Sequence, residues 1–202
     1  MKELTERLTK ELISRLFVEV EASARHIHLT AQDAETLFGH SLSPVRPLSQ
    51  PGQYLCRERV WLRGPKGQIS RVAVLGPERS RTQVELSMTD CITLGIHAPV
   101  RQSGDIAGSA GITIGTERAE LTINEGVIVA QRHIHMPPDE AAKRSLHDGQ
   151  EVKLRCLSTR PVTFEGVVVR VHREFAPFAH IDLDEANACG LRSGDLALIL
   201  PS

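Results

Sequence analysis

The sequence Arg-His-Ile-His occurs twice in the chain, at residues 25–28 and 132–135, and an apolar residue follows each copy. In a β-strand, successive side chains point to opposite faces. The two histidines of a copy would therefore share one face while the intervening isoleucine enters the core. Two neutral imidazoles on one strand face are good ligands for zinc or a similar divalent metal. The pattern predicts two metal-binding strands.

Two further segments, residues 85–88 and 180–183, alternate polar and apolar residues in the same way, as Glu-Leu-Ser-Met and His-Ile-Asp-Leu. After each of the four segments stands a residue suited to beginning a helix: Thr30, Thr89, Pro137 and Asp184. A glycine then ends each predicted helix: Gly39, Gly95, Gly149 and Gly190. The chain is therefore predicted to contain a fourfold strand-helix-turn-strand repeat, with two copies in each half.

The candidate metal ligands are the polar side chains at matching positions of these four segments. They are His26, His28, Glu85, His133, His135 and His180, with Asp182 in reserve. Six such side chains suffice for two metal ions with open coordination positions, the arrangement that catalysis requires. The alternatives are that the histidines lie on a solvated face or are satisfied by backbone hydrogen bonds; the repetition favours metal binding. Four histidines lie outside the pattern and are expected at the surface or at helix ends: His40, His97, His147 and His172.

The arginines near these segments fall into two groups. Arg25 and Arg132 directly precede the histidine pairs, so strand alternation sends them to the opposite face, where ion pairs or solvation are expected. Arg79 and Arg81 lie in the loop sequence GPERSRTQVE, just before Glu85. Either guanidinium could lie beside a metal ion and bind phosphate or carboxylate through its two-pronged geometry. A purely structural role is the alternative for each.

The elements that would position these residues are short. Apolar runs rich in β-branched residues, such as RVAVLG and GVVVRV, are separated by glycine and proline. This pattern of short strands separated by turns predicts a mainly β protein with short α-helices, built as two related β-barrel domains. The stretch at 99–111 is poor in bulky apolar residues, and we place the boundary there. The predicted domains are residues 17–104 and 105–202, with an exchange of segments near the termini allowed.

Residues 1–16 are predicted to form an amphipathic helix, because Leu4, Leu8, Leu12 and Leu16 recur at helical spacing. The favoured interpretation is a helix packed on its own domain. The alternative is a docking or targeting helix that binds a partner.

Composition limits the classes of partner. The chain of 202 residues has 24 basic and 25 acidic residues, which argues against a broad surface for nucleic acid or an anionic membrane. Its four cysteines are widely spaced and predict neither a zinc ribbon nor a disulfide framework. No apolar run is long enough to span a membrane, and the N-terminus does not resemble a signal peptide. We therefore expect a reduced, cytoplasmic protein.

Several longer motifs closely resemble the phosphate propanoyltransferases, the metal-dependent phosphotransacylases of the propanediol-utilisation type. These motifs include VEVEASARHIHLT, LSQPGQ, VLGPERSRTQVELSMTD, VIVAQRHIHMPPDEA and HIDLDEANACGL, and the match runs from about residue 17 to the end. The resemblance implies reversible transfer of an acyl group between coenzyme A and phosphate, on two β-barrel domains. It also implies a pair of zinc ions at the junction of the domains, held by the six ligand positions, and a phosphate-binding role for Arg79.

This function agrees with the residue-level analysis. Phosphate would attack the thioester directly, because no serine or cysteine nucleophile is required. A metal-dependent thioester hydrolase and a non-catalytic metal-binding module remain as alternatives. The family further implies a homodimer, and some members are housed in bacterial microcompartments through an N-terminal extension. We favour a free cytoplasmic enzyme of acetate or propanoate metabolism over microcompartment association.

Overall fold

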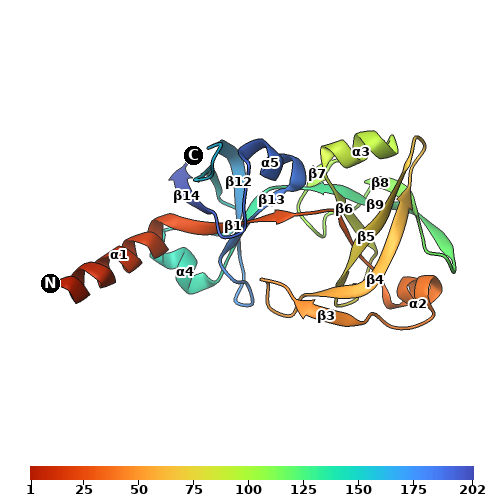
Figure 1. The fold of residues 1–202 in the computed structure, drawn as a ribbon, viewed down its shortest axis with the longest axis horizontal. Coiled ribbons are helices and arrows are strands. Elements are labelled where there is room, and N and C mark those ends of the chain that lie inside the picture. The colour runs from red at the N-terminus through yellow and green to blue at the C-terminus, as the bar shows by residue number, and fades with distance from the viewer. The chain divides into compact units, whose positions relative to one another are not determined.

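The computed structural model describes residues 1–202, with the side chains of Glu3, Leu8 and Lys10 outside the description. The chain divides into two compact units. The central unit comprises Ala24–Gln131 and Asp182–Asp184. The terminal unit comprises Met1–Ser23, Arg132–Ile181 and Glu185–Ser202. Each unit is described by itself below, and Figure 1 labels their elements.

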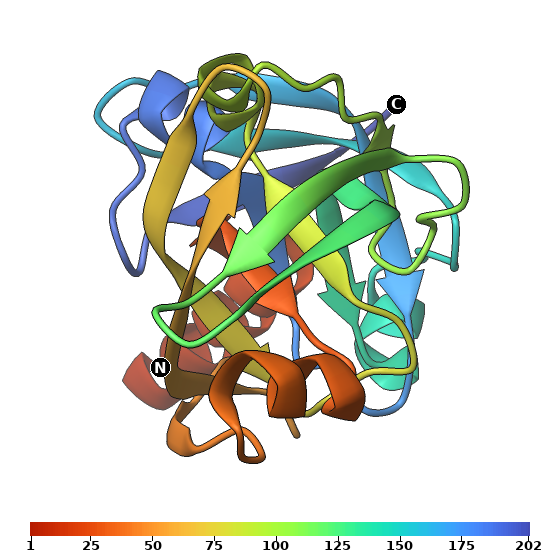
Figure 2. The same ribbon diagram turned by 90° about the vertical axis from the view of Figure 1, so that its right-hand side faces the viewer.

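The central unit is built on a closed ring of strands. Its strands are β2 (His26–His28), β3 (Pro44–Pro47), β4 (Tyr54–Arg63), β5 (Gln68–Gly76), β6 (Gln83–Leu86), β7 (Val100–Arg101), β8 (Ala110–Gly115) and β9 (Glu120–Ala130). The ring runs β4-β5-β2-β6-β9-β8 and closes from β8 back to β4, while β3 and β7 pair at its margins. Its helices are α2 (Ala31–Phe38) and α3 (Met88–Leu94). In Figure 2 the β8–β9 hairpin forms the side of the ring nearest the viewer, and α2 lies at the bottom of the view.

The terminal unit also contains a closed barrel. Its elements are α1 (Lys2–Leu16), β1 (Phe17–Ser23), β10 (His133–Met136), α4 (Pro138–Lys143), β11 (Glu151–Cys156), β12 (Thr163–Val171), β13 (Phe178–Asp182), α5 (Leu183–Cys189) and β14 (Leu196–Pro201). The barrel order is β1-β13-β10-β12-β11-β14, and β1 pairs with β14. A strand from the beginning of the chain thus completes a barrel made of strands from its end.

The two barrels share one pairing scheme. In the central unit β2 pairs with β5 in parallel and with β6 antiparallel. In the terminal unit β10 pairs with β12 in parallel and with β13 antiparallel. The register is equivalent as well, because His26 is opposite Glu85 and His133 is opposite His180. The structure therefore confirms the prediction of a mainly β fold with two related barrels.

The division of the chain differs from the expected boundary at residue 104. Both β8 and β9 lie beyond that residue, yet they pair with β4 and β6 and close the central barrel. The glycine- and serine-rich stretch at 99–111 belongs to the same unit and carries β7. The stretch with few bulky apolar residues is therefore a loop within one barrel. The β8–β9 hairpin that follows it packs in the core of that same barrel.

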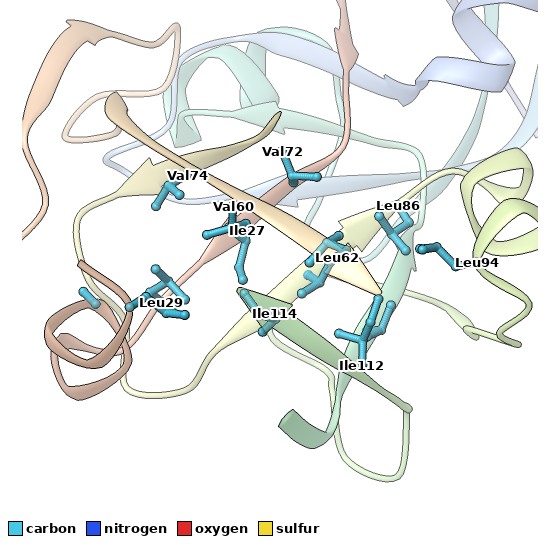
Figure 3. Packing of buried hydrophobic residues seen from close by; sticks show 14 of the residues in the cluster. Ile27, Leu29, Val60, Leu62, Val72, Val74, Leu86, Leu94, Ile112 and Ile114 are labelled. Atoms are coloured by element: carbon cyan, nitrogen blue, oxygen red, sulfur yellow. The ribbon is translucent and has the colours of Figure 1, made fainter. Parts of the chain in front are cut away.

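Strand alternation places the apolar residues as predicted. Ile27 and Leu29 are fully buried in the central core, where Figure 3 shows them among side chains from β4, β5 and β8. Ile134 and Met136 are equally buried in the core of the terminal barrel. Full burial of one such side chain is worth about 1.5–3 kcal/mol, so these residues fix which face of each strand points outward.

The helix that follows β6 begins earlier than expected. Ser87, not Thr89, is the N-cap residue, and its side chain accepts a hydrogen bond from the backbone of Asp90. The Asp90 side chain accepts from the backbone of Ser87 in return, which completes a capping box. Thr30 and Pro137 do occupy N-cap positions as predicted. Gly39 and Gly95 are left-handed C-caps, but α4 ends at Lys143, well before Gly149.

The apolar stripe of α1 does not pack on the barrel. Leu4, Leu12, Ile13 and Leu16 are between 45% and 58% exposed, while the side chain of Leu8 is outside the description. Figure 1 shows that α1 continues into β1 with no intervening turn and does not fold back over its own barrel. The favoured interpretation of a packed helix was therefore wrong for the four leucine and isoleucine side chains just named. In the described part of the chain, no helix has both the length and the apolar character needed to cross a membrane.

Candidate metal centres and anion site

The central unit gathers three candidate ligands on one face of two neighbouring strands. His26 and His28 come from β2 and Glu85 comes from β6. Each offers a ligand atom within 4.8 Å of those of the other two. The three residues are only 7%, 2% and 7% exposed, respectively. Antiparallel register places His26 opposite Glu85, and His26 Nε2 lies 3.5 Å from Glu85 Oε2. The solvated-face alternative is therefore excluded for this group.

The nitrogens of these imidazoles suit a metal ion. His26 Nδ1 lies 2.8 Å from the carbonyl oxygen of Ala24, and a proton on Nδ1 would leave Nε2 as the ligand atom. His28 Nδ1 is buried and has no hydrogen-bond partner among the described atoms. Burial, together with the charges of His26 and Arg79, lowers the pKa of His28 from 6.5 to about 2. His28 is therefore neutral at pH 7 and can donate a lone pair.

The terminal unit gathers a second set of candidate ligands. His133 and His135 on β10 lie beside His180 on β13, and their ligand atoms are again within 4.8 Å of one another. Both ring nitrogens of His135 are buried without a hydrogen-bond partner in the described structure. Burial, together with the charges of His133, His180 and Arg170, lowers its pKa to about 2. A buried polar atom without a partner costs free energy, and a bound metal ion would remove that cost.

The two loop arginines have different surroundings. The backbone N–H of Arg79 donates to the carbonyl oxygen of Leu29, and its Nη1 donates to Ser103 Oγ at 3.2 Å. Its charge also lowers the pKa of His28, which places the guanidinium near the central cluster. Arg81 instead forms an ion pair with Glu125, with half of its side chain exposed. The structure therefore brings Arg79, but not Arg81, beside candidate metal ligands.

Other predictions for polar residues can be compared directly. Asp182 is the last residue of β13, immediately before α5, and it is not in either group of candidate ligands found among the described residues. Arg25 and Arg132 form ion pairs with Asp90 and Glu185, as expected for side chains on the opposite strand face. The four histidines outside the repeat are all exposed: His40, His97, His147 and His172.

Two residues at the central cluster were not predicted. Gln83 is 2% exposed and hydrogen bonds to Glu85, and Ser103 hydrogen bonds to both Gln83 and Arg79. Alternation could have indicated Gln83, because it lies two residues before Glu85 on the same strand and therefore on the same face. No sequence signal indicates Ser103, which lies in a loop and is brought in by the fold.

Two barrels with equivalent strand pairing, each carrying a group of candidate metal-ligand residues, define a duplicated β-barrel protein. The family model of the phosphate propanoyltransferases matches residues 19–192. The chain is 48% identical over 206 residues to the phosphate propanoyltransferase of Clostridioides difficile (strain 630), with 99% of each chain covered. It is also 48% identical to that of Enterococcus faecalis (strain ATCC 700802 / V583), covering 99% of this chain and 97% of the relative.

A third relative is the phosphate propanoyltransferase of Thermotoga maritima (strain ATCC 43589 / DSM 3109 / JCM 10099 / NBRC 100826 / MSB8). It is 48% identical over 184 residues, which cover 90% of this chain and 88% of the relative. The chain therefore belongs to the phosphate propanoyltransferase family and is an acyltransferase.

Proposed function

We propose that the protein transfers a short acyl group reversibly between coenzyme A and inorganic phosphate, with zinc as its metal. In one direction, acyl-CoA and phosphate give acyl phosphate and free CoA. The observation that carries the proposal is the buried central cluster with Arg79 beside it, in a chain of the phosphate propanoyltransferase family.

The donor atoms fit zinc at both clusters. His26, His28 and Glu85 would hold one ion in the central unit, and three imidazoles would hold another in the terminal unit: His133, His135 and His180. Three protein ligands with one position left open is the usual composition of a catalytic zinc site, and the buried unpartnered nitrogens support it. Bound zinc would supply Lewis acidity toward a carbonyl or phosphoryl oxygen.

Arg79 would bind and orient phosphate. Its guanidinium can form paired, charge-assisted hydrogen bonds to two phosphate oxygens, and the contact with Ser103 restricts where those donors point. A phosphate oxygen attacks the thioester carbonyl carbon, which forms the new C–O bond. The C–S bond then breaks, and the proton given up by hydrogen phosphate balances the charge of the departing CoA thiolate. Oriented binding of this kind lowers the entropic part of the barrier.

The cysteines support direct attack. All four are buried free thiols. Burial raises the pKa of Cys56 to about 11 and that of Cys156 to about 12, and it also raises the pKa of Cys91. Since the thiolate is the nucleophilic form, these three groups are poor nucleophiles at neutral pH. We therefore propose that no acyl-cysteine intermediate forms.

The test is release of CoA thiol from acetyl-CoA and propanoyl-CoA by purified, zinc-loaded protein, with and without phosphate and after chelation. The proposal predicts release that requires both phosphate and metal, with one acyl phosphate formed per thiol. Thiol release without phosphate would identify a thioester hydrolase instead. Absence of release from folded, zinc-loaded protein would leave the clusters as a non-catalytic metal-binding device.

The proposal also includes a cytoplasmic location, which is expected from the sequence composition, and a homodimer, which is expected from the family resemblance. Sedimentation of the purified protein measures the second directly. A mass twice that of the 22.2 kDa chain would support a dimer, and the mass of one chain would contradict it.

A further inference from the structure

We propose that Gln83 and Ser103 are positioning residues that hold the Glu85 carboxylate and the Arg79 guanidinium in one fixed arrangement. This inference rests on the proposed function, because it assigns Glu85 to the metal and Arg79 to phosphate. It adds a connection between the two: a chain of hydrogen bonds that runs from the carboxylate through an amide and a hydroxyl to the guanidinium.

Gln83 is the centre of this chain. Its Nε2 donates to Glu85 Oε1 at 2.6 Å and to Ser103 Oγ at 2.9 Å. Its Oε1 accepts from the backbone N–H of Gly104 at 2.8 Å. A backbone N–H can only donate, so the amide oxygen must face Gly104 and the amide nitrogen must face the carboxylate and the hydroxyl. The orientation of the amide is thus set by its partners, and both of its hydrogens are used.

The amide determines how Glu85 meets a metal ion. Gln83 occupies Oε1, whereas Oε2 is the oxygen directed toward His26, at 3.5 Å from Nε2. A hydrogen bond to an ionised carboxylate is stronger than one between neutral groups, and it favours the ionised form that a metal requires. The arrangement therefore presents Oε2 to the metal and prevents the carboxylate from turning. Such support of a ligand by a neighbouring group is a common feature of metal sites.

Ser103 carries the connection onward to the anion site. Its Oγ accepts from Gln83 Nε2 at 2.9 Å and from Arg79 Nη1 at 3.2 Å, which uses the two acceptor positions of one hydroxyl. Ser103 lies between β7 and β8, whereas Arg79 lies between β5 and β6. One hydroxyl therefore ties two loops of the central unit together at the point where the guanidinium is needed.

The terminal barrel shows that the fold itself does not require a glutamine here. Gln83 is opposite His28 in the register of β6 and β2, and the equivalent residue opposite His135 is Phe178. An aromatic side chain fills that position in a barrel with the same pairing scheme. A buried amide costs free energy unless all its hydrogen bonds are made, so its presence at one cluster alone points to a role at that cluster.

Two variants separate the two halves of the chain of hydrogen bonds. Gln83→Leu removes the contact to Glu85, so zinc affinity of the central cluster should fall about 10- to 100-fold and the KM for phosphate should rise. Ser103→Ala leaves the contact between Gln83 and Glu85 intact, so the KM for phosphate should rise about tenfold while zinc affinity stays unchanged. Ser103→Thr keeps the hydroxyl and should restore the KM. The exposed Thr122→Ala is the matched control for loss of a hydroxyl.

Zinc affinity is measured by competition with a chromogenic chelator, and thermal unfolding of each metal-free variant confirms that it is folded. Unchanged zinc affinity in a folded Gln83→Leu variant, or an unchanged phosphate KM in Ser103→Ala, would overturn the inference. Should Gln83→Leu not fold, Ser103→Ala and Ser103→Thr decide alone. The wild-type protein tests the proposed function separately, because absence of phosphate-dependent thiol release there would refute that function whatever the variants do.

Discussion

The central and terminal barrels hold similar histidine pairs in different chemical surroundings. Both pairs occupy one strand that is parallel to one neighbour and antiparallel to another. The third candidate ligand is a carboxylate, Glu85, in the central cluster and an imidazole, His180, in the terminal one. The central cluster also has Gln83 and Arg79 nearby, while in the terminal cluster the ring centroids of His135 and Phe175 are 4.0 Å apart.

The comparison indicates that the shared strand pairing positions the candidate ligands. The residues around each cluster then determine which groups the cluster can bind. A carboxylate ligand lowers the net charge of a zinc site by one relative to a third imidazole. Polar groups at the central cluster can bind and orient an anion, whereas an aromatic ring limits the approach of water. These features support the proposal that phosphate binds at the central cluster.

Loss of a histidine ligand is the largest expected effect and tests both clusters at once. His28→Ala should remove the central zinc, leave one zinc per chain and lower kcat/KM at least about 10³-fold, because Lewis acidity is worth several kcal/mol. His133→Ala should remove the terminal zinc in the same way and also abolish activity. Metal analysis by mass spectrometry and the thiol-release assay measure both outcomes. Two zinc ions retained in either variant would contradict the assignment of that ligand.

The two loop arginines sharpen the assignment of phosphate to the central cluster. Arg79→Ala should raise the KM for phosphate about 10- to 100-fold, since hydrogen bonds to charged groups are worth about 1.5–3 kcal/mol. Zinc content should not change. Arg81→Ala is the control, because it removes an ion pair with Glu125 at the surface and should alter the KM less than about twofold. Equal effects of the two substitutions would show that the phosphate is bound elsewhere.

Removal of the N-terminal helix alone is expected to have the smallest effect, and comparison with a longer truncation tests how the terminal barrel is completed. Removal of residues 1–16 deletes an exposed helix and should lower Tm by only about 1–2 °C, in line with the small cost of surface changes. Removal of residues 1–23 also deletes β1, which pairs with β14, and should prevent the terminal barrel from folding. Thermal unfolding followed by circular dichroism compares the two. A large loss of stability in the shorter truncation would show that α1 contributes to the packing of its barrel.

The sequence predicted which residues gather in the two candidate ligand groups, because strand alternation and the fourfold repeat pointed to the same positions. Alternation along each strand fixed the face of His26 and His28, and the fourfold repeat identified Glu85 and His180 as their counterparts. The repeat did not predict that Asp182 lies directly before a helix. Counted from the first residue of each repeated segment, α3 and α5 begin two residues earlier than α2 and α4. At Ser87 the reciprocal bonds with Asp90 set this earlier start.

The parts that were not predicted depend on contacts between distant segments. Because β8 pairs with β4, the central unit extends beyond the predicted boundary at residue 104. No local sequence pattern indicates that pairing. Ser103 reaches the central cluster through the path of its loop, and the exposed face of α1 follows from its direct continuation into β1. Each depends on tertiary structure, whereas periodicity describes only which face of an element is apolar.

The most direct test of the account is to titrate metal-free protein with zinc while following phosphate-dependent thiol release from acyl-CoA. The account predicts no activity without metal, a rise as zinc binds, and a plateau at one ion for each of the two clusters. Full activity in the metal-free protein, or zinc binding that leaves thiol release independent of phosphate, would contradict it.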